Sequence, residues 1–257
     1  MSIQGSVDAQ KSTQNQRADS LAPFWIKLKP SFNFLFAFSF LAVLFTYINF
    51  LPTRFKTSLG EKKIISLSDG SKIHLNSLSD ISHHDSYNIK DRTISLNGEA
   101  YFEVMKGEIP FIVKTEYGNV KVLGTSFNIY NRDDGFELGV NEGKVNFSKN
   151  LESQDLIKGQ ILQNSSKINN INILEKVYSN YPDWKNNKIY CNQTSLNKIC
   201  SEIERIFNIS VTFSNPEVGD LTISGTINTQ TLDNALSTIS LLSQHEFKLN
   251  GDQCTIL

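Results

Sequence analysis

The chain has 257 residues and almost balanced charge, with 25 lysines and arginines against 26 aspartates and glutamates and a net charge of −1. This balance gives no broad positive field for a polyanion, and the sequence has no basic patch with interleaved aromatic residues, so direct nucleic-acid binding is not expected. The three cysteines are an odd number without a CxxC pair, and we expect them to be small buried hydrophobic residues.

Residues 1–30 are expected to form a short polar tail. Residues 1–20 have almost nothing to bury, which predicts disorder. Trp25 then lies in a short apolar patch beside Lys27 and Lys29, an arrangement typical of an interfacial membrane anchor. The alternative is that this patch docks a cytoplasmic partner.

Residues 31–51 form one uncharged run of 21 residues. As a helix, the run would span roughly 31 Å, close to the hydrocarbon thickness of a bilayer. We therefore predict a single-pass membrane protein, and the proposed anchor residues are Trp25, Phe36, Phe40 and Leu44. Lysines and arginines are equally numerous on the two flanks, so charge alone does not orient the helix.

Residues 57–165 follow the two-residue period of β-strands. Short apolar runs alternate with frequent turn signals, a pattern typical of an all-β sandwich or roll. Gly124 is predicted to form a bulge, and three other glycines are predicted to occupy turns, namely Gly70, Gly98 and Gly143. At the second of these turns, the pair Asn97-Gly98 predicts a tight hairpin.

Residues 166–183 are rich in Asn, Ser and Ile and are expected to connect two domains. Residues 184–257 then predict a small α+β domain with the order β-α-β-β-α-β-β. Helical spacing of apolar residues places helices around 196–207 and 232–242, packed on one face of a small sheet. The residues predicted to cap the start and follow the end of the first helix are Thr194 or Ser195, and Asn208.

No motif in the sequence predicts catalysis, a cofactor or a metal site. Phosphate loops, dinucleotide loops, nucleophile elbows and histidines or cysteines at zinc spacing are missing from the sequence. Glu99 and Glu103 share one face of a predicted strand, with Tyr101 between them, which resembles the acid pair of a glycosidase. A solvated strand face explains these acids more simply, so an enzyme is not expected.

The segment 221–227 is the predicted partner-binding strand. It is rich in β-branched residues, and small α+β domains offer open sheet edges to which an extended partner can add. The candidate contact residues are Leu221, Ile223 and Thr226. An interior strand is the alternative interpretation.

A series of short words runs through the β region in fixed order. The most specific are GEAYFEV at 98–104 and VLGTSFN at 122–128, accompanied by LSDGS at 67–71, PFIV at 110–113 and EGKV at 142–145. Together they resemble the FecR family of membrane-bound sigma-factor regulators. The region from Trp184 onward resembles the small α+β domain of Bacteroidota-type members.

The resemblance implies a protein of the cell inner membrane, with its N-terminus in the cytoplasm and both folded domains in the periplasm. It implies an anti-sigma factor whose cytoplasmic partner is an extracytoplasmic-function sigma factor. It implies that the periplasmic partner is the signalling domain of a TonB-dependent outer-membrane transporter. Residues 1–30 are short for a sigma-binding segment, so a membrane-anchored periplasmic protein-binding module without sigma-factor control is the alternative.

Overall fold

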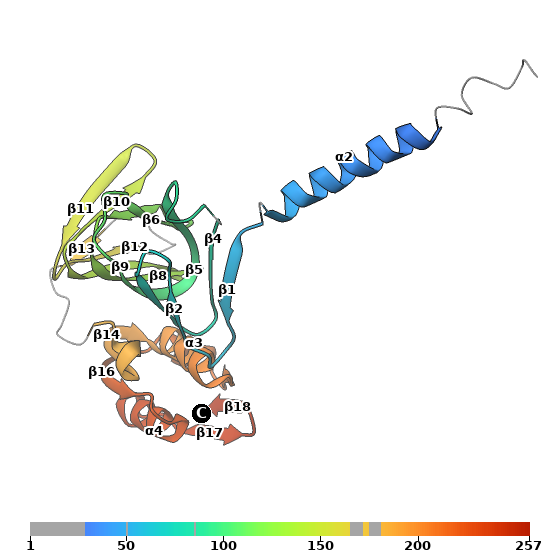
Figure 1. Ribbon diagram of the computed structural model, residues 1–257. Coiled ribbons are helices and arrows are strands. Elements are labelled where there is room, and N and C mark those ends of the chain that lie inside the picture. Colours follow the sequence, from blue (N-terminus) through green and yellow to red (C-terminus); the bar gives the residue numbers. More distant parts are fainter. Residues whose placement is uncertain (1–28, 50, 85, 165–171, 175–180) are drawn as a thin grey trace, which may run out of the picture. The chain divides into compact units, whose positions relative to one another are not determined.

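The computed structural model describes residues 29–49, 51–84, 86–164, 172–174 and 181–257. The chain divides into two compact units, residues 1–51 and 52–257. The first unit contains helix α2 (Lys29–Asn49) (Figure 1). Every side chain of this helix from Phe34 to Thr46 is exposed. A search of the described residues for a helix long and apolar enough to cross a membrane found none.

The second unit begins with a β domain whose thirteen strands form one continuous sheet that curls over a shared core (Figure 1). The first seven strands are β1 (Thr53–Thr57), β2 (Lys63–Ser66), β3 (Lys72–Leu75), β4 (Ser79–His83), β5 (Arg92–Glu103), β6 (Phe111–Lys114) and β7 (Asn119–Val122). The remaining six are β8 (Ser126–Arg132), β9 (Gly135–Glu142), β10 (Lys144–Lys149), β11 (Glu152–Ile157), β12 (Ile161–Asn164) and β13 (Asn172–Leu174). Strand β1 starts before the boundary expected at residue 57 and pairs with β4.

Strand β5 joins the two halves of the curled sheet. Its first part pairs with β4 and, in parallel, with β6, whereas its second part pairs with β3 and β8. One half of the sheet therefore runs β1-β4-β5-β6-β7-β10-β11, and the other runs β2-β3-β5-β8-β9-β12-β13. The core lies between the halves, where the rings of Phe102 and Phe127 stack with their centroids 4.9 Å apart. The prediction of a mostly β domain is therefore confirmed.

The hairpin predicted at Asn97-Gly98 is wrong, because both residues lie inside the continuous strand β5. Gly98 has a φ of +102°, and a Cβ atom at this position would lie 2.7 Å from the Cα atom of Ser79. Only glycine combines this backbone conformation with so close a neighbour. The Asn-Gly signal therefore marks the point where β5 passes from one half of the sheet to the other.

The other three glycines differ in their roles. Gly70 and Gly143 have φ values of +84° in the connections β2–β3 and β9–β10, as expected for turns. Gly124 lies between β7 and β8, outside both strands, so the bulge predicted there is wrong. The register shift lies instead between Ser126 and Phe127, in the pairing of β8 with β9.

The C-terminal domain begins with a short 3-10 helix η2 (Asp183–Asn186) and follows the predicted β-α-β-β-α-β-β order. Its elements are β14 (Lys188–Ser195), α3 (Leu196–Phe207), β15 (Ser210–Phe213), η3 (Pro216–Asp220), β16 (Thr222–Asn228), α4 (Leu232–Ser243), β17 (Phe247–Asn250) and β18 (Gln253–Ile256). Two small sheets, β14-β16 and β15-β18-β17, replace the single sheet that we expected. The strand pairing explains this difference, because β18 pairs in parallel with β15 and not with β16.

The helix boundaries of the C-terminal domain follow from local chemistry. Ser195 caps α3 by accepting a hydrogen bond from the Lys198 backbone nitrogen, and Asn208 ends the helix in the left-handed conformation. The apolar face of α3 packs into a second core, separate from that of the β domain. All three cysteines are free and buried, which confirms their expected role as small hydrophobic residues; they are Cys191, Cys200 and Cys254.

Candidate functional site

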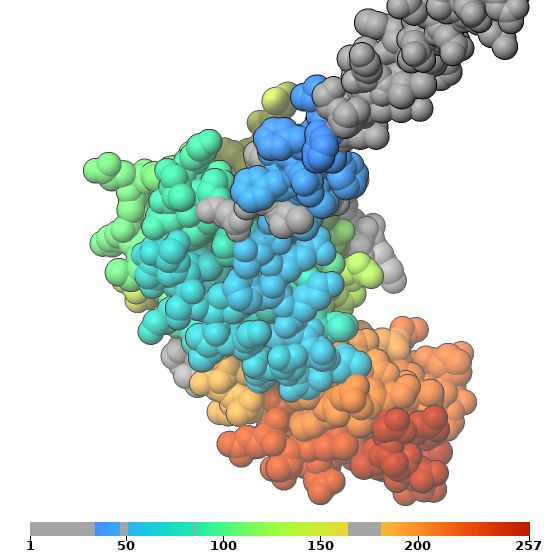
Figure 2. Space-filling model, turned by 45° about the vertical axis from the view of Figure 1, so that its right-hand side comes forward, coloured from blue at the N-terminus to red at the C-terminus, as the bar shows by residue number. Residues whose placement is uncertain are grey.

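The C-terminal domain packs against the β domain (Figure 2). Its side chains and the preceding Tyr181 contact the outer face of strands β5, β8 and β9, whose inner face covers the β core. Because strand residues alternate between faces, the odd-numbered residues of β5 from Glu99 point outward and Ala100 and Phe102 point into the core. We name this contact the interdomain seam. It is formed by Asn76, Glu99, Tyr101, Glu103, Asn128 and Tyr130 on one side, and by Tyr181, Trp184, Lys185, Glu202 and Arg205 on the other.

Glu99 lies at the centre of the seam and is only 7% exposed. Its two carboxylate oxygens accept hydrogen bonds from the side-chain amides of Asn76, at 2.8 Å, and Asn128, at 2.9 Å. Burial, followed by the negative charge of Glu202 on α3, raises the pKa of Glu99 to about 7. The sequence interpretation of this residue as part of a solvated face is therefore wrong, because the C-terminal domain covers it.

Trp184 joins the C-terminal domain to the Glu99 network. Its indole nitrogen donates to the side-chain oxygen of Asn128 at 3.2 Å, and its ring is 9% exposed. The ammonium group of Lys62 donates to the Trp184 carbonyl oxygen at 2.8 Å and to the Asn187 side chain at 3.2 Å. This short 3-10 segment is thus fixed to the β domain by Asn128 of strand β8 and by Lys62 of the connection between β1 and β2.

A second polar group lies on the same face of β5, around Glu103. The carboxylate of Glu103 pairs with Lys185 at 3.2 Å and with His74 at 3.0 Å. The Lys185 ammonium also lies over the ring of Tyr101, 3.7 Å from its centroid, a cation–π geometry. Burial tends to raise the pKa of Glu103, but the Lys185 and His74 interactions outweigh it and hold that pKa below its ordinary value.

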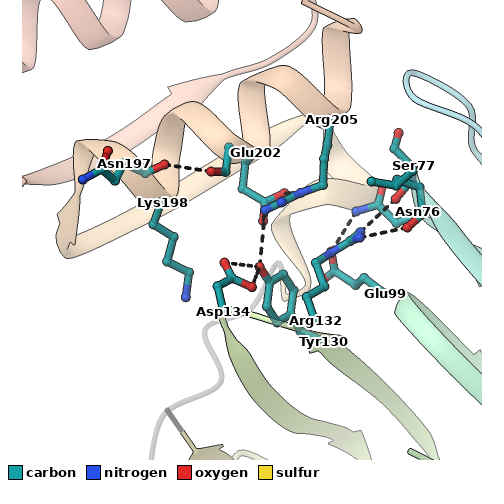
Figure 3. Close-up of polar contacts among 12 residues, drawn as sticks. Asn76, Ser77, Glu99, Tyr130, Arg132, Asp134, Asn197, Lys198, Glu202 and Arg205 are labelled. Carbon is teal, nitrogen blue, oxygen red and sulfur yellow. Dashed lines mark hydrogen bonds and ion pairs between the residues drawn. The ribbon is translucent and has the colours of Figure 1, made fainter. Parts of the chain in front are cut away.

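Helix α3 contacts the end of β8 through a chain of charged and phenolic groups (Figure 3). The Arg205 guanidinium donates to the Tyr130 hydroxyl at 3.3 Å and pairs with Glu202 at 2.5 Å. The Tyr130 hydroxyl donates to Asp134 at 2.8 Å. Burial disfavours the charged form of Arg205, yet the facing Glu202 raises its pKa, so this residue stays cationic.

A cleft of about 440 Å³ opens beside these residues, between β1, the start of β4, the β8–β9 turn and α3. Its walls carry both signs of charge, from Lys56, Arg132 and Arg205 and from Asp80 and Asp134. Arg132 is buried, and its guanidinium donates to the backbone carbonyls at 77 and 78 (Figure 3). Of the lining residues, Arg205 contacts the β domain through Tyr130, whereas Arg132 is bonded within the β domain.

The candidate partner strand β16 pairs with β14, and within the described residues no strand covers its other edge. Leu221 is 43% exposed and Thr226 is also exposed, so both are available for contact. Ile223 is only 6% exposed and packs in the C-terminal core, so its side chain is not a contact residue. Alternation along the strand explains why Ile223 and Thr226 point to opposite faces.

The predicted anchor residues are only partly described. Phe36, Phe40 and Leu44 lie on α2 with exposed side chains, whereas Trp25 lies outside the described residues. Elsewhere in the described part of the chain, no group of three or more His, Cys, Asp or Glu side chains is arranged to hold a metal ion.

The sequence search for chemistry missed the seam itself. Its residues come from two strands, two connecting segments, a 3-10 segment and a helix, and they share no spacing that one motif would reveal. The sequence GEAYFEV did contain one signal. Strand alternation places Tyr101 on the same outer face as Glu99 and Glu103, so this face was predicted to carry an aromatic residue. An aromatic residue on an outer strand face indicates a covered surface as readily as a solvated one.

Two family models match the chain. The model described as "FecR protein" matches residues 53–146, and the model described as "FecR, C-terminal" matches residues 188–256. A search of the curated proteins found no match.

Solved structures similar to this chain include two from Parabacteroides distasonis ATCC 8503, both provisionally assigned as anti-sigma factors. The structure at 2.50 Å resolution is 26% identical with a TM-score of 0.75. The structure at 1.65 Å resolution is 25% identical with a TM-score of 0.74. In both cases the match covers 80% of this chain and 98% of the other chain.

Proposed function

Because this chain belongs to the FecR family, we propose that it binds and regulates a sigma factor, acting as an anti-sigma factor. The observation that carries the proposal is the match of both folded domains to the family, at residues 53–146 and 188–256. The similar structures from P. distasonis, provisionally assigned to this role, support it over 80% of the chain. The role that we propose is binding, and its support is that the polar side chains of the seam are engaged with one another.

The proposal places the chain in the inner membrane, with residues 31–51 as its anchor. Supporting it are the absence of charge over this run and the exposed apolar side chains of α2, including Phe36, Phe40 and Leu44. At the two ends of the run, residues 31–33 and 47–50 lie outside the residues whose side chains the structure describes. Residues 1–30 are then cytoplasmic and residues 52–257 periplasmic, and protease treatment of spheroplasts tests this directly: degradation of the larger part is expected.

The periplasmic partner in this proposal is the signalling domain of a TonB-dependent outer-membrane transporter. The family resemblance supports this link. A surface for it is the edge of β16 that no strand of the described residues covers, with Thr226 on the strand and Leu221 just before it exposed. The expected result is binding of such a domain to the full chain, with loss of binding when Thr226 is replaced by Pro. Circular dichroism of the variant separates lost binding from lost folding.

The sigma-factor role is tested by co-purification of the full chain with an extracytoplasmic-function sigma factor encoded beside its gene. Retention of the sigma factor is expected, and its loss is expected in a variant that lacks residues 1–30. Deletion of the gene should change transcription of the sigma factor's targets. If the chain binds a transporter domain but no sigma factor, and the deletion leaves these transcripts unchanged, the anchored binding module is the correct reading.

A further inference from the structure

The strongest unexplained feature of the molecule is a carboxyl group buried between two domains. Glu99 comes from the β domain, but the outer face on which it lies is covered by the C-terminal domain through Trp184, Lys185 and α3. Asn128 connects the two sides, since it donates to Glu99 and accepts from the Trp184 indole. The seam therefore couples the environment of one carboxyl group to the docking of a whole domain.

Charged and titratable groups face Glu99 from every side of the seam. Glu202 approaches from α3 and opposes a negative charge on Glu99 (Figure 3). Arg132 on β8 favours the charge, and Lys62, in the connection before β2, also interacts with it. Tyr181 is buried nearby and feels the Glu99 charge. Burial is the largest influence and Glu202 the next, and together they raise the pKa of Glu99 to about 7.

We propose that the interdomain seam is a proton-operated latch, in which a proton on Glu99 holds the C-terminal domain against the β domain and its loss favours release. The inference concerns the two folded domains only and goes beyond the proposed function, since it holds whichever partner the chain binds.

Thermodynamic linkage gives the direction of the effect. In the docked state Glu99 is buried and faces Glu202, whereas separation of the domains would return it to water and remove that neighbour. The docked state therefore binds the proton more tightly than the separated state. Docking is then strongest below the ordinary pKa of 4.5, and it weakens as the pH rises toward about 7.

Glu103 provides a natural contrast on the same strand. Its side chain is 41% exposed, and its ion pair with Lys185, together with the contact from His74, holds its pKa below the ordinary value despite partial burial. An ionised Glu103 therefore supports docking, whereas an ionised Glu99 opposes it. Neutralising the two residues should have opposite effects on the seam.

The test uses hydrogen exchange of the full chain in detergent micelles. The Gly60 amide donates to the Arg205 carbonyl oxygen at 2.8 Å across the seam, so its exchange reports domain separation. After correction for the intrinsic pH dependence of exchange, its protection should fall by up to about tenfold per pH unit between about pH 5 and pH 7. Amides of Phe127 and Ile129 in the β core serve as internal references and should not change.

The variant Glu99→Gln keeps the shape but removes the proton equilibrium, and it should show constant Gly60 protection across this range. The matched control Glu103→Gln should lower protection at every pH while keeping the pH dependence. The proposal is overturned if Glu99→Gln keeps the wild-type pH dependence, or if wild-type protection does not vary with pH. Should Glu99→Gln fail to fold by circular dichroism, Glu202→Gln must shift the midpoint to lower pH, and an unshifted midpoint equally overturns the proposal.

Discussion

The indole nitrogen of Trp184 donates to the side-chain oxygen of Asn128 at 3.2 Å, and the amide of Asn128 donates in turn to Glu99 at 2.9 Å. One asparagine thus satisfies a donor from the C-terminal domain and an acceptor from the β domain. All three side chains are buried, so each lost hydrogen bond would leave a polar atom without water.

Replacement of Trp184 by Phe should destabilise the chain by about 1–3 kcal/mol. The ring volume is largely kept, but the oxygen of Asn128 loses its donor in a buried position. Urea unfolding of the full chain measures the change. The control is Leu241→Ala on α4, at a position that is 80% exposed, where a change within about 0.5 kcal/mol is expected. Equal effects of the two substitutions would contradict the buried role of the indole.

Replacement of Glu202 by Gln should lower the pKa of Glu99 from about 7, because the charge of Glu202 is the second largest influence that raises it. Carbon-13 NMR titration of labelled glutamate carboxyl groups measures this pKa. The control Glu217→Gln lies on the exposed 3-10 helix η3 and should leave the pKa unchanged. An unchanged value in Glu202→Gln would show that burial alone is responsible.

Replacement of Asp69 by Asn should destabilise the β domain by about 3 kcal/mol. Asp69 and Arg92 form an ion pair at 3.1 Å whose side chains are almost fully buried, and removal of one partner leaves the other charge uncompensated. The exposed ion pair of Lys144 and Asp155, at 2.7 Å, is the control, and Asp155→Asn should have a much smaller effect because water screens this pair. Similar losses would contradict the importance of burial.

Because of Asp69, we also expect the β domain to lose stability at low pH. Burial would raise its pKa, but hydrogen bonds from Ser71, Tyr87 and Arg92 outweigh burial and hold the pKa below the ordinary 3.8. Because the unfolded chain then binds a proton more readily, the stabilisation is present above pH 3.8 and is lost as the pH falls through the lower folded value. Urea unfolding below pH 4 should show this loss in wild type and a smaller one in Asp69→Asn.

Replacement of Gly98 by Ala should be strongly destabilising, by about 3 kcal/mol or more. The new methyl group would meet the backbone of Ser79 in addition to the strain of a positive φ. Gly159 is the matched control, since its φ is +92° but no atom lies within 4 Å of its Cβ position. Gly159→Ala should therefore cost only the strain, about 1 kcal/mol. Thermal unfolding distinguishes the two, and equal costs would exclude the steric argument.

The sequence predicted most of the local structure of the C-terminal domain. Helix α3 begins after Ser195 and ends at Phe207 as expected, because capping and helical spacing are local signals. The β domain was harder, since Asn97-Gly98 carries a hairpin signal that only long-range pairing with β4 and β8 overrides. Local preference and tertiary pairing disagree there, and the pairing decides.

The seam was beyond a sequence reading for a different reason. The burial and the pKa of Glu99 depend on helix α3, which lies about a hundred residues later in the chain. The sequence around Glu99 does not predict that Glu202 will face it. The same argument explains Ile223, whose β-branched segment was expected to offer its side chains to a partner. Its burial is set by α3 and α4, which complete the C-terminal core around it.

The passage of β5 through both halves of the sheet has a consequence for how this chain can reach its native state. Neither half of the sheet is complete without that strand, so the two halves are expected to fold together. A stable intermediate with only one half folded is therefore not expected. Its neighbours β3 and β8 arrive from opposite directions along the chain, which raises contact order and slows folding. A shortened chain that stops before β8 would expose the unpaired edge of β5, and exposed strand edges promote aggregation.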